Sequence, residues 1–591
     1  MFLMHNLVQK TVTLVGASGL SPLNLCIIAV VLAFFWLYPA VFRRMFRRCA
    51  SVSGMFDRHR AATVLLVALV PIAGRLLLLS SHPVPVPRIP DEFSYLLASD
   101  TFSQGRVTNP AHPLWQFFET IHVLPFPTYM SKYPPAQGLL LAAGQVLFGH
   151  PWWGVVLSIG LMVGSVCWML QGWLPGRWAA LGALATGLQF GIGHAWMNSY
   201  WGGAPAAIGA CIVLGALARL KQFRPFPCRP VRYSLLFALG IVILLNSRPW
   251  EGMAVIVPAA IAVLLWMFGR SGTQLFERVR AVLVPASVLL LVGATAMSYY
   301  NWRVTGNPLH LPYTTIHKTY SVVPLFVWQS STPAPSFRHT VLKRYFLETE
   351  PHYQAADTLG TLRGWAAAQP WRLRMAKDLL FGNFFLMLCL PMVFIYASPP
   401  LRFLLAILGV FIVALALESW NQIHYFGPVI GLAAVLKMSS LRWLSAVKIH
   451  RRKIGIALST GVILCSALNL IQDSMVFPQR DVFSSERAGI QKELESTDGL
   501  HVVLVRYADD HPPVQQWVYN RANIDASKVV WAWEMSDQEN RRLFDYFKGR
   551  TFWLLEPDAA PPHLKPLFAA GQHGDRGPVS LLNGPEPLQE K

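Results

Sequence analysis

Two adjacent acidic residues, Asp91 and Glu92, are the first candidates for chemistry in this sequence. They lie in the segment 88–95, just after an apolar stretch and at the start of a long polar loop. An ionisable group close to a lipid bilayer is costly unless it is used. A pair of acids offers a general base and a neighbour whose negative charge raises the proton affinity of that base. The structural alternative is a helix cap or a solvated loop acid.

A cation follows in the same loop. Lys132 and Tyr133 belong to the segment 127–138, where two consecutive prolines stop any preceding helix and fix the entry to the next one. Lys132 is therefore predicted to lie at a membrane surface, where an ammonium group can hold a phosphate headgroup. The alternative is an ordinary lysine that reaches from the apolar layer to water.

Polar and aromatic residues also gather in four short segments, 194–203, 246–251, 299–303 and 418–425. Interfacial Trp and Tyr need no neighbouring Asn, His, Glu or Arg, so these segments exceed what an aromatic belt requires. A lone histidine at a membrane edge is more often structural, and aromatic residues there are often anchors. The candidate binding residues in these segments are His194, Asn198, Tyr200, Trp201, Arg248, Arg303, Glu418 and His424.

Membrane helices must position these residues. Of the 591 residues, 53% are hydrophobic and only 14% are charged, and the mean hydropathy is +0.39. Such a chain is too apolar for a soluble globular protein. The predicted fold class is a polytopic α-helical membrane protein with about twelve spans. The apolar runs cover residues 23–42, 61–80, 152–172, 178–195, 203–220, 233–247, 251–268, 281–299, 379–397, 401–418, 424–438 and 454–471.

The basic residues predict the orientation of these spans. Arginines and lysines concentrate after the first, fifth and eleventh runs, which makes those loops cytoplasmic. Alternating the other spans across the membrane places the loops 81–151 and 300–378 and the tail from residue 472 outside. All the candidate residues then share the outer side. The same distribution accounts for the net charge of +20 without nucleic acid as a partner.

Three regions are predicted: an additional N-terminal helix with a basic loop (1–60), a transmembrane core (61–471) and a soluble outer α/β domain (472–591). In the last region, 501–507, 528–533 and 551–555 are β-branched or aromatic runs typical of strands. Ser536 and Glu539 form a capping box that opens a helix, which ends near Gly549. This order favours a small parallel sheet. It has no phosphate-loop pattern, so we interpret the domain as accessory.

Other functional classes find little support. The seven cysteines lie in predicted spans or basic loops, which argues against a disulfide framework. The N-terminus lacks the pattern of a removable signal peptide. No histidines or acids have the spacing of metal ligands, so neither a metal site nor a cofactor is predicted.

The outer acidic pair, the long first outer loop and the Lys-Tyr-Pro-Pro segment together resemble the C-type glycosyltransferase (GT-C) superfamily. The similarity is nearest to the glycosyltransferase family 39-like branch, which includes protein O-mannosyltransferases and lipid A aminoarabinose transferases. It covers about residues 60–440 in order and topology, and two short motifs in residues. There are two departures. Tyr133 separates Lys132 from Pro134, where the family often has Lys directly before Pro, and the span 23–42 is an addition.

The resemblance implies that a sugar is transferred from a polyprenyl phosphate outside the cytoplasm, with an acid of the first outer loop at the catalytic centre. It gives Asp91 the role of base and Glu92 a supporting role, and it places Lys132 near the lipid phosphate. The chemistry of such a transfer requires the same groups. The acceptor must lose a proton to a base, and the departing phosphate needs cations, which Lys132, Arg248 and Arg303 could supply. Direct displacement with one base would invert the anomeric configuration.

The expected partners are a polyprenyl-phosphate sugar donor, the lipid bilayer of the inner (plasma) membrane, and an outer acceptor that is a glycan, a lipid or a protein. Two other classes stay open. A transporter or flippase for a lipid-linked or polar solute would also have many spans, but it predicts related halves and charges at mid-helix. A scaffold that binds a partner through its C-terminal domain would leave Asp91 dispensable.

Overall fold

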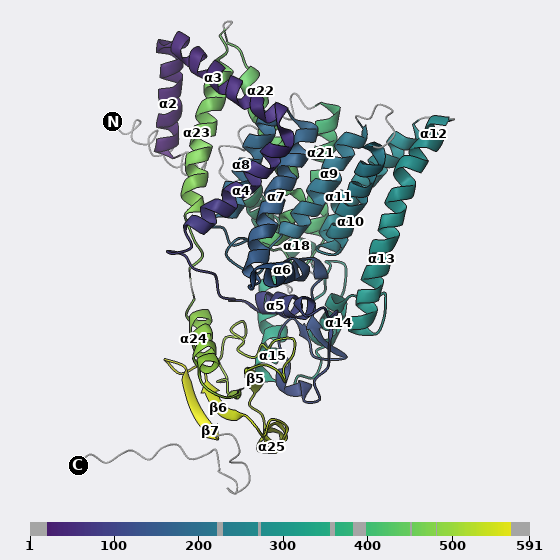
Figure 1. Ribbon diagram of the computed structural model, residues 1–591, viewed down its shortest axis with the longest axis vertical. Coiled ribbons are helices and arrows are strands. Elements are labelled where there is room, and N and C mark those ends of the chain that lie inside the picture. Colours follow the sequence, from purple (N-terminus) through teal and green to yellow (C-terminus); the bar gives the residue numbers. More distant parts are fainter. Residues whose placement is uncertain are drawn as a thin grey trace, which may run out of the picture.

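A helical bundle with a mixed helical and β-sheet layer at one end makes up this protein (Figure 1). The computed structural model describes residues 21–221, 229–269, 273–354, 361–381, 398–449, 452–479 and 481–568. In Figure 1 the bundle occupies the upper part, and the C-terminal sheet lies below it at the end opposite α3 (Pro39–Arg58).

The bundle consists mainly of apolar helices. They are α2 (Pro22–Leu37), α4 (Arg60–Leu77), α6 (Pro135–Phe148), α7 (Trp152–Trp173), α8 (Gly176–Gly191), α9 (Ala204–Lys221), α10 (Arg229–Leu245), α11 (Pro249–Phe268), α12 (Thr273–Arg278), η2 (Val279–Leu283), α13 (Val284–Thr305), α21 (Pro399–Ala416), η4 (Ile423–Val429), α22 (Ile430–Ala446) and α23 (Ile454–Ser474). Among the described residues, seven helical stretches are long and apolar enough to cross a membrane, and four shorter apolar helices accompany them.

The chain is therefore a multi-pass membrane protein, as the sequence predicts. Every predicted span except 379–397 coincides with a helix, and most of that one lies outside the described residues. The prediction treated 139–147 only as a weakly apolar part of the first loop. It is instead the second half of α6, which packs between α5 (Pro90–Ser103) and α7.

The first long loop, residues 81–151, is folded. Pro90 opens α5 and Pro135 opens α6, each at a position where proline's fixed φ suits the first helical turn. Between them lie β1 (Asn109–Pro110), the 3-10 helix η1 (Trp115–Phe118), β2 (Val123–Leu124) and β3 (Thr128–Ser131). The strands form a small antiparallel sheet in the order β1-β3-β2. This loop therefore holds both predicted motifs on ordered elements.

The second long loop, residues 300–378, is largely helical where the structure describes it. It contains α14 (Pro312–Tyr320), α15 (Thr340–Arg344), η3 (Tyr345–Thr349), α16 (Glu350–Gln354) and α18 (Leu362–Phe381). Trp365 donates from its indole N–H to the carbonyl of Ala416, 2.8 Å away, which ties α18 to the end of α21.

The C-terminal α/β fold agrees with the prediction. It contains α24 (Val482–Ser496), β4 (His501–Val505), β5 (Val529–Trp533), α25 (Asp537–Tyr546), β6 (Thr551–Glu556) and β7 (His563–Phe568). The strand order is β5-β4-β6-β7. The first three strands are parallel, and the unpredicted β7 pairs antiparallel with β6. Ser536 caps α25 as expected: its hydroxyl oxygen accepts the Glu539 backbone N–H at 3.4 Å, and the hydroxyl also donates to the Glu539 carboxylate at 2.7 Å.

This C-terminal unit shares its core with the first long loop. The ring of Phe93 on α5 stacks on Tyr519 with centroids 4.4 Å apart, and the Trp533 indole donates to the Glu119 carbonyl at 2.7 Å. Buried residues of both segments belong to one apolar cluster. The segment that carries Asp91 is thus packed between the C-terminal unit and the helical bundle.

The contact between α6 and α7 gives a test of the packing. A Cβ on Gly144 would lie 1.9 Å from the Gly154 backbone nitrogen, so the two backbones touch. We expect Gly144→Ala to lower the thermal midpoint of the purified protein, because overpacking costs about 1–3 kcal/mol. Gly409→Ala in α21, where a Cβ meets nothing within 4 Å, is the matched control and should leave the midpoint unchanged or higher. Equal midpoints for both variants would contradict this contact.

Candidate functional site

Asp91 lies in the first turn of α5, and its carboxylate faces Tyr133. Tyr133 donates its phenolic hydrogen bond to Asp91 Oδ1. Burial and then the charge of Asp91 raise the pKa of Tyr133 well above its usual value, so the phenol stays a neutral donor. The Asp91 side chain is 23% exposed, which leaves it accessible to an incoming group. The sequence motifs are thus in direct contact.

Lys132 is buried beside this contact. Its ammonium group lies 5.1 Å from the Tyr133 ring centroid and 5.0 Å from that of Tyr313. Burial lowers the pKa of Lys132 to about 8, although the charges of Asp91 and Glu350 raise it in part. Among the described residues, no carboxylate forms an ion pair with this ammonium group within 4 Å. An anion would be a favourable partner here.

A cavity of about 350 Å³ opens in front of Lys132. Arg248 also lines it, from the residue before α11, and Tyr133 connects it to Asp91, which is not itself in the wall. The wall is mixed, with polar groups on one part and apolar side chains on the rest. The apolar part includes Met253, Met297, Leu311, Leu325, Phe326 and Trp420.

Arg248 is oriented by its own helix. Its Nη1 lies 3.4 Å from Glu251 Oε1 in the first turn of α11, and its guanidinium lies 4.1 Å from the Tyr425 ring centroid. The glutamate and the aromatic face hold the cation in place in a site of low dielectric. The prediction included Arg248 but missed Glu251, which lies three residues further along the same motif.

Two more acids are buried around the cavity. Glu418 lines it, and burial together with the charge of Glu251 raises the pKa of Glu418 well above its usual value. Glu350 accepts a 2.7 Å hydrogen bond from Ser321, and burial raises its pKa to about 7. Both carboxyls therefore bind a proton more readily than an ordinary glutamate does, which reduces the negative charge next to the cations of the cavity.

His122 was missed by the sequence prediction. Its Nε2 lies 3.7 Å from Asp91 Oδ2 and 3.3 Å from the Tyr345 hydroxyl, and no described residue bonds to its buried Nδ1. Burial and the charge of Lys132 hold the pKa of His122 well below its usual value, so this contact is a neutral one rather than an ion pair. Its positive φ of 67° lies where few residues besides glycine are stable. The contacts span more than thirty residues of sequence, so no local pattern marks His122.

Glu92 lies away from the cavity. Its carboxylate accepts the backbone N–H of Tyr200 at 3.0 Å and that of Arg88 at 3.3 Å. The side chain is 1% exposed, and burial raises its pKa to about 7. These contacts anchor the start of α5 to the segment before α9.

Several predicted binding residues lie outside the cavity wall. Arg303 is on the exposed face of α13, where it donates to the Tyr299 hydroxyl at 2.9 Å. His194 accepts the backbone N–H of Trp196 at 3.2 Å, and burial lowers its pKa to about 4. Asn198 accepts from Arg75, and the Tyr200 hydroxyl donates to the Pro85 carbonyl at 2.9 Å.

Trp201 and His424 contact each other, with ring centroids 4.2 Å apart. The Trp201 indole nitrogen and His424 Nδ1 are both buried without a hydrogen-bond partner among the described residues. Neither residue lines the cavity, although Tyr425, the next residue after His424, does. Of the predicted set, the structure therefore brings Asp91, Lys132, Tyr133, Arg248 and Glu418 together.

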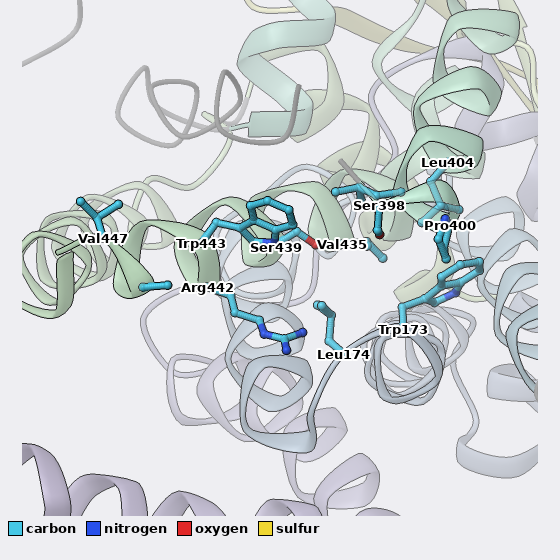
Figure 2. Close-up of a pocket in the computed structure, with 12 residues that line it drawn as sticks. Trp173, Leu174, Ser398, Pro400, Leu404, Val435, Ser439, Arg442, Trp443 and Val447 are labelled. Atoms are coloured by element: carbon cyan, nitrogen blue, oxygen red, sulfur yellow. The ribbon is translucent and has the colours of Figure 1, made fainter. Parts of the chain in front are cut away.

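A second cavity, of about 560 Å³, lies at the other end of the bundle. Figure 2 shows Trp173, Ser398 and Arg442 around it. The wall of this cavity includes α22 residues from Val435 to Ala446, whereas the first cavity takes Tyr425 from the segment before α22, so the two cavities have no lining residue in common. Across the described ranges, no three His, Cys, Asp or Glu side chains gather closely enough to hold a metal ion.

No family model and no curated protein matches the chain. Among solved structures, it is similar to ArnT from Cupriavidus metallidurans in the apo state, with a TM-score of 0.44 and 13% identity over 86% of this chain and 93% of ArnT. It is similar to the same protein bound to undecaprenyl phosphate, with a TM-score of 0.42 and 14% identity over 84% and 92%.

The oligosaccharyltransferase of Archaeoglobus fulgidus is also similar, with a TM-score of 0.36 and 11% identity over 75% of this chain. The chain covers only 62% of that transferase. These proteins belong to the GT-C class that the two sequence motifs resemble. Structures this distant do not assign roles to individual residues or substrates to this chain. Both have to be inferred from the side chains of the chain itself.

Glu92 gives a pH-dependent prediction. Its raised pKa means that the folded state keeps a proton between pH 4.5 and about 7 that the unfolded state has lost, so stability should fall as the pH rises through this window. We expect Glu92→Gln to flatten that fall, by up to roughly 3 kcal/mol at 1.36 kcal/mol per pKa unit. Thermal midpoints in detergent from pH 5 to 8 would measure it. Exposed Glu493→Gln is the control, and parallel curves for all three proteins would refute the role of Glu92 burial.

Proposed function

We propose that this protein is a membrane glycosyltransferase that moves a sugar from a polyprenyl-phosphate donor to an extracytoplasmic acceptor. In this proposal residues 61–471 are the catalytic core, residues 1–60 are an addition to it, and residues 472–591 form an accessory outer domain. The membrane is the inner (plasma) membrane, and the site faces outward. The prediction of outward orientation comes from the basic loops at the other end of the helices.

The observation that carries the proposal is the cavity shared by Lys132 and Arg248 next to Asp91. Two cations face a space that also has apolar walls from Met253 and Met297. A polyprenyl phosphate has the same two parts, an anionic headgroup and a hydrocarbon chain. The cavity therefore offers a suitable wall to each part of such a lipid.

The reaction follows from these groups. The acceptor hydroxyl gives its proton to the Asp91 carboxylate while its oxygen forms the bond to the anomeric carbon. The bond between that carbon and the phosphate oxygen breaks, and the electron pair leaves with the phosphate. Lys132 and Arg248 stabilise the charge that develops on the leaving group. A single displacement inverts the anomeric configuration.

The surrounding residues have supporting roles in this proposal. Tyr133 holds the Asp91 carboxylate through its hydroxyl, and Glu92 fixes the first turn of α5. Arg303, His194, Asn198, Tyr200, Trp201 and His424 support the outer loops rather than the reacting atoms, since the cavity wall does not include them.

Asp91→Asn tests the base directly. The amide keeps the size of the side chain but cannot accept the proton, so we expect turnover to fall about 10²–10⁴-fold. The assay is transfer of sugar from synthetic polyprenyl-phosphate donors by the purified full chain, with candidate outer acceptors. Exposed Asp498→Asn is the matched control and should keep full turnover.

Full turnover in Asp91→Asn would remove Asp91 from its role. Solute uptake into liposomes by the wild-type protein, without transfer, would instead identify a transporter. Binding of the donor should persist in Asp91→Asn, because the cations that hold the phosphate are unchanged.

The pKa of Lys132 predicts a pH dependence of lipid binding. Lysine is positively charged below its pKa, and a pKa of about 8 means that the free site loses this charge as the pH rises through 8. Affinity for undecaprenyl phosphate should therefore weaken between pH 7 and pH 9. Lys132→Arg should abolish this weakening, since arginine stays charged, and Lys132→Met should bind about tenfold or more weakly at pH 7.

Exposed Lys343→Arg on α15 serves as the control and should follow the wild-type curve. A titration of undecaprenyl phosphate by native mass spectrometry at each pH supplies the affinities. Identical pH curves for wild type and Lys132→Arg would exclude Lys132 from phosphate binding.

A further inference from the structure

A second cation, Arg75, is buried without a counter-ion near the end of α4. The residue is 1% exposed. Its Nε donates to Asn198 Oδ1 at 2.8 Å and its Nη2 donates to the Pro83 carbonyl at 3.1 Å. Its Nη1 is buried and has no hydrogen-bond partner among the described residues. Across the described residues, no carboxylate forms an ion pair with the Arg75 guanidinium within 4 Å.

This arrangement is energetically incomplete. A guanidinium near the edge of a membrane normally reaches toward water or pairs with an acid. Arg75 does neither, because Trp152 and Phe477 lie 5.0 Å and 5.5 Å from its guanidinium carbon. Aromatic faces offset part of the desolvation, but they do not neutralise the charge. An anion beside Arg75 would do so.

A cavity of about 290 Å³ adjoins Arg75. Arg88 lines it as a second cation, and its Nη1 donates to the Gln479 carbonyl at 2.9 Å. His82, stacked on Phe477 at 3.7 Å, and the hydroxyls of Ser81 and Ser484 complete the polar part of the wall. Among the described residues that line this cavity there is no carboxylate. The described wall therefore carries two positively charged side chains and no negatively charged one.

We propose that this cavity binds a phosphate group at a site distinct from the one in front of Lys132. Guanidinium forks match phosphate oxygens, and two of them converge here. The source is the headgroup of an anionic membrane lipid or free phosphate. Arg75 lies two residues before the end of α4, a helix long and apolar enough to cross a membrane, so its side chain is close to one end of that span. The two cavities share no lining residue, so the proposal is independent of the proposed function.

The site is connected to α5. Arg88 lies three residues before Asp91, and its backbone N–H donates to Glu92. Its side chain also contacts the connection between α23 and α24, which passes beside the end of α4 in Figure 1. An anion that holds Arg88 would thus fix the start of α5 and the entry to the C-terminal unit together.

Arg88→Gln is the main test, because Arg75→Met also breaks the bond to Asn198 and can impair folding. Phosphatidylglycerol is titrated onto the purified full chain and followed by native mass spectrometry. We expect one lipid to bind to the wild type and its affinity to fall about tenfold in Arg88→Gln, the loss of one charged contact. Arg106→Gln in the same outer loop is the matched control and should bind as the wild type does.

A second arm uses inorganic phosphate against chloride at equal ionic strength and reads the thermal midpoint. A rise in the wild type that is lost in Arg88→Gln, without a lipid effect, would identify free phosphate as the source. Equal responses of the wild type, Arg88→Gln and Arg106→Gln in both arms would overturn the proposal. Undecaprenyl phosphate binding through Lys132 should persist in Arg88→Gln, so failure here is distinguishable from failure of the proposed function.

Discussion

The burial of charge at one end of the bundle is the constraint on which this structure depends. Arg248 is compensated by Glu251 and by the face of Tyr425, whereas Lys132 has aromatic neighbours and no ion-pair partner within the described ranges. Leaving a buried ammonium uncompensated costs several kcal/mol unless it loses its proton or gains an anion. The lowered pKa of Lys132 reflects that cost. An anionic ligand would neutralise this buried charge and remove the cost. The same uncompensated charge that destabilises the empty site therefore favours binding of an anion.

Helix starts bring these groups together. The helices α6, α11 and α14 each have a proline in their first turn and begin at the wall of the candidate cavity, and α5, which also opens with a proline, contributes Tyr95 to that wall. Proline at this position costs no hydrogen bond and fixes the direction of the chain. Several helix N-termini facing one space also add partial positive charge, which favours an anion. The backbone thus adds to the positive potential that Lys132 and Arg248 give the cavity.

Local patterns allowed much of the fold to be predicted. The strands β4, β5 and β6 are short, largely buried runs rich in Val, Trp and Leu, and this composition is enough to predict strands. Local patterns do not predict which distant segments come into contact. His122 meets Tyr345 across 223 positions, and Glu350 reaches Ser321 through the fold of the second loop. Arg303 was assigned from its aromatic neighbours, but the buried face of α13 is formed by Asn301 and Val304, which turns Arg303 outward.

Tyr133, which interrupts the expected Lys-Pro motif, has a structural role of its own. The family often has lysine directly before proline, whereas this chain has Tyr133 between Lys132 and Pro134. The phenol donates to Asp91, and its ring stacks on Tyr95 with centroids 4.4 Å apart. Tyr95 in turn lines the same cavity as Arg248. The added residue therefore connects the carboxylate on α5 to the wall of the cavity through two aromatic rings. A phenylalanine at position 133 would preserve the stack but leave Asp91 without its donor, so the hydroxyl is the part of this residue that couples the acid to the cavity.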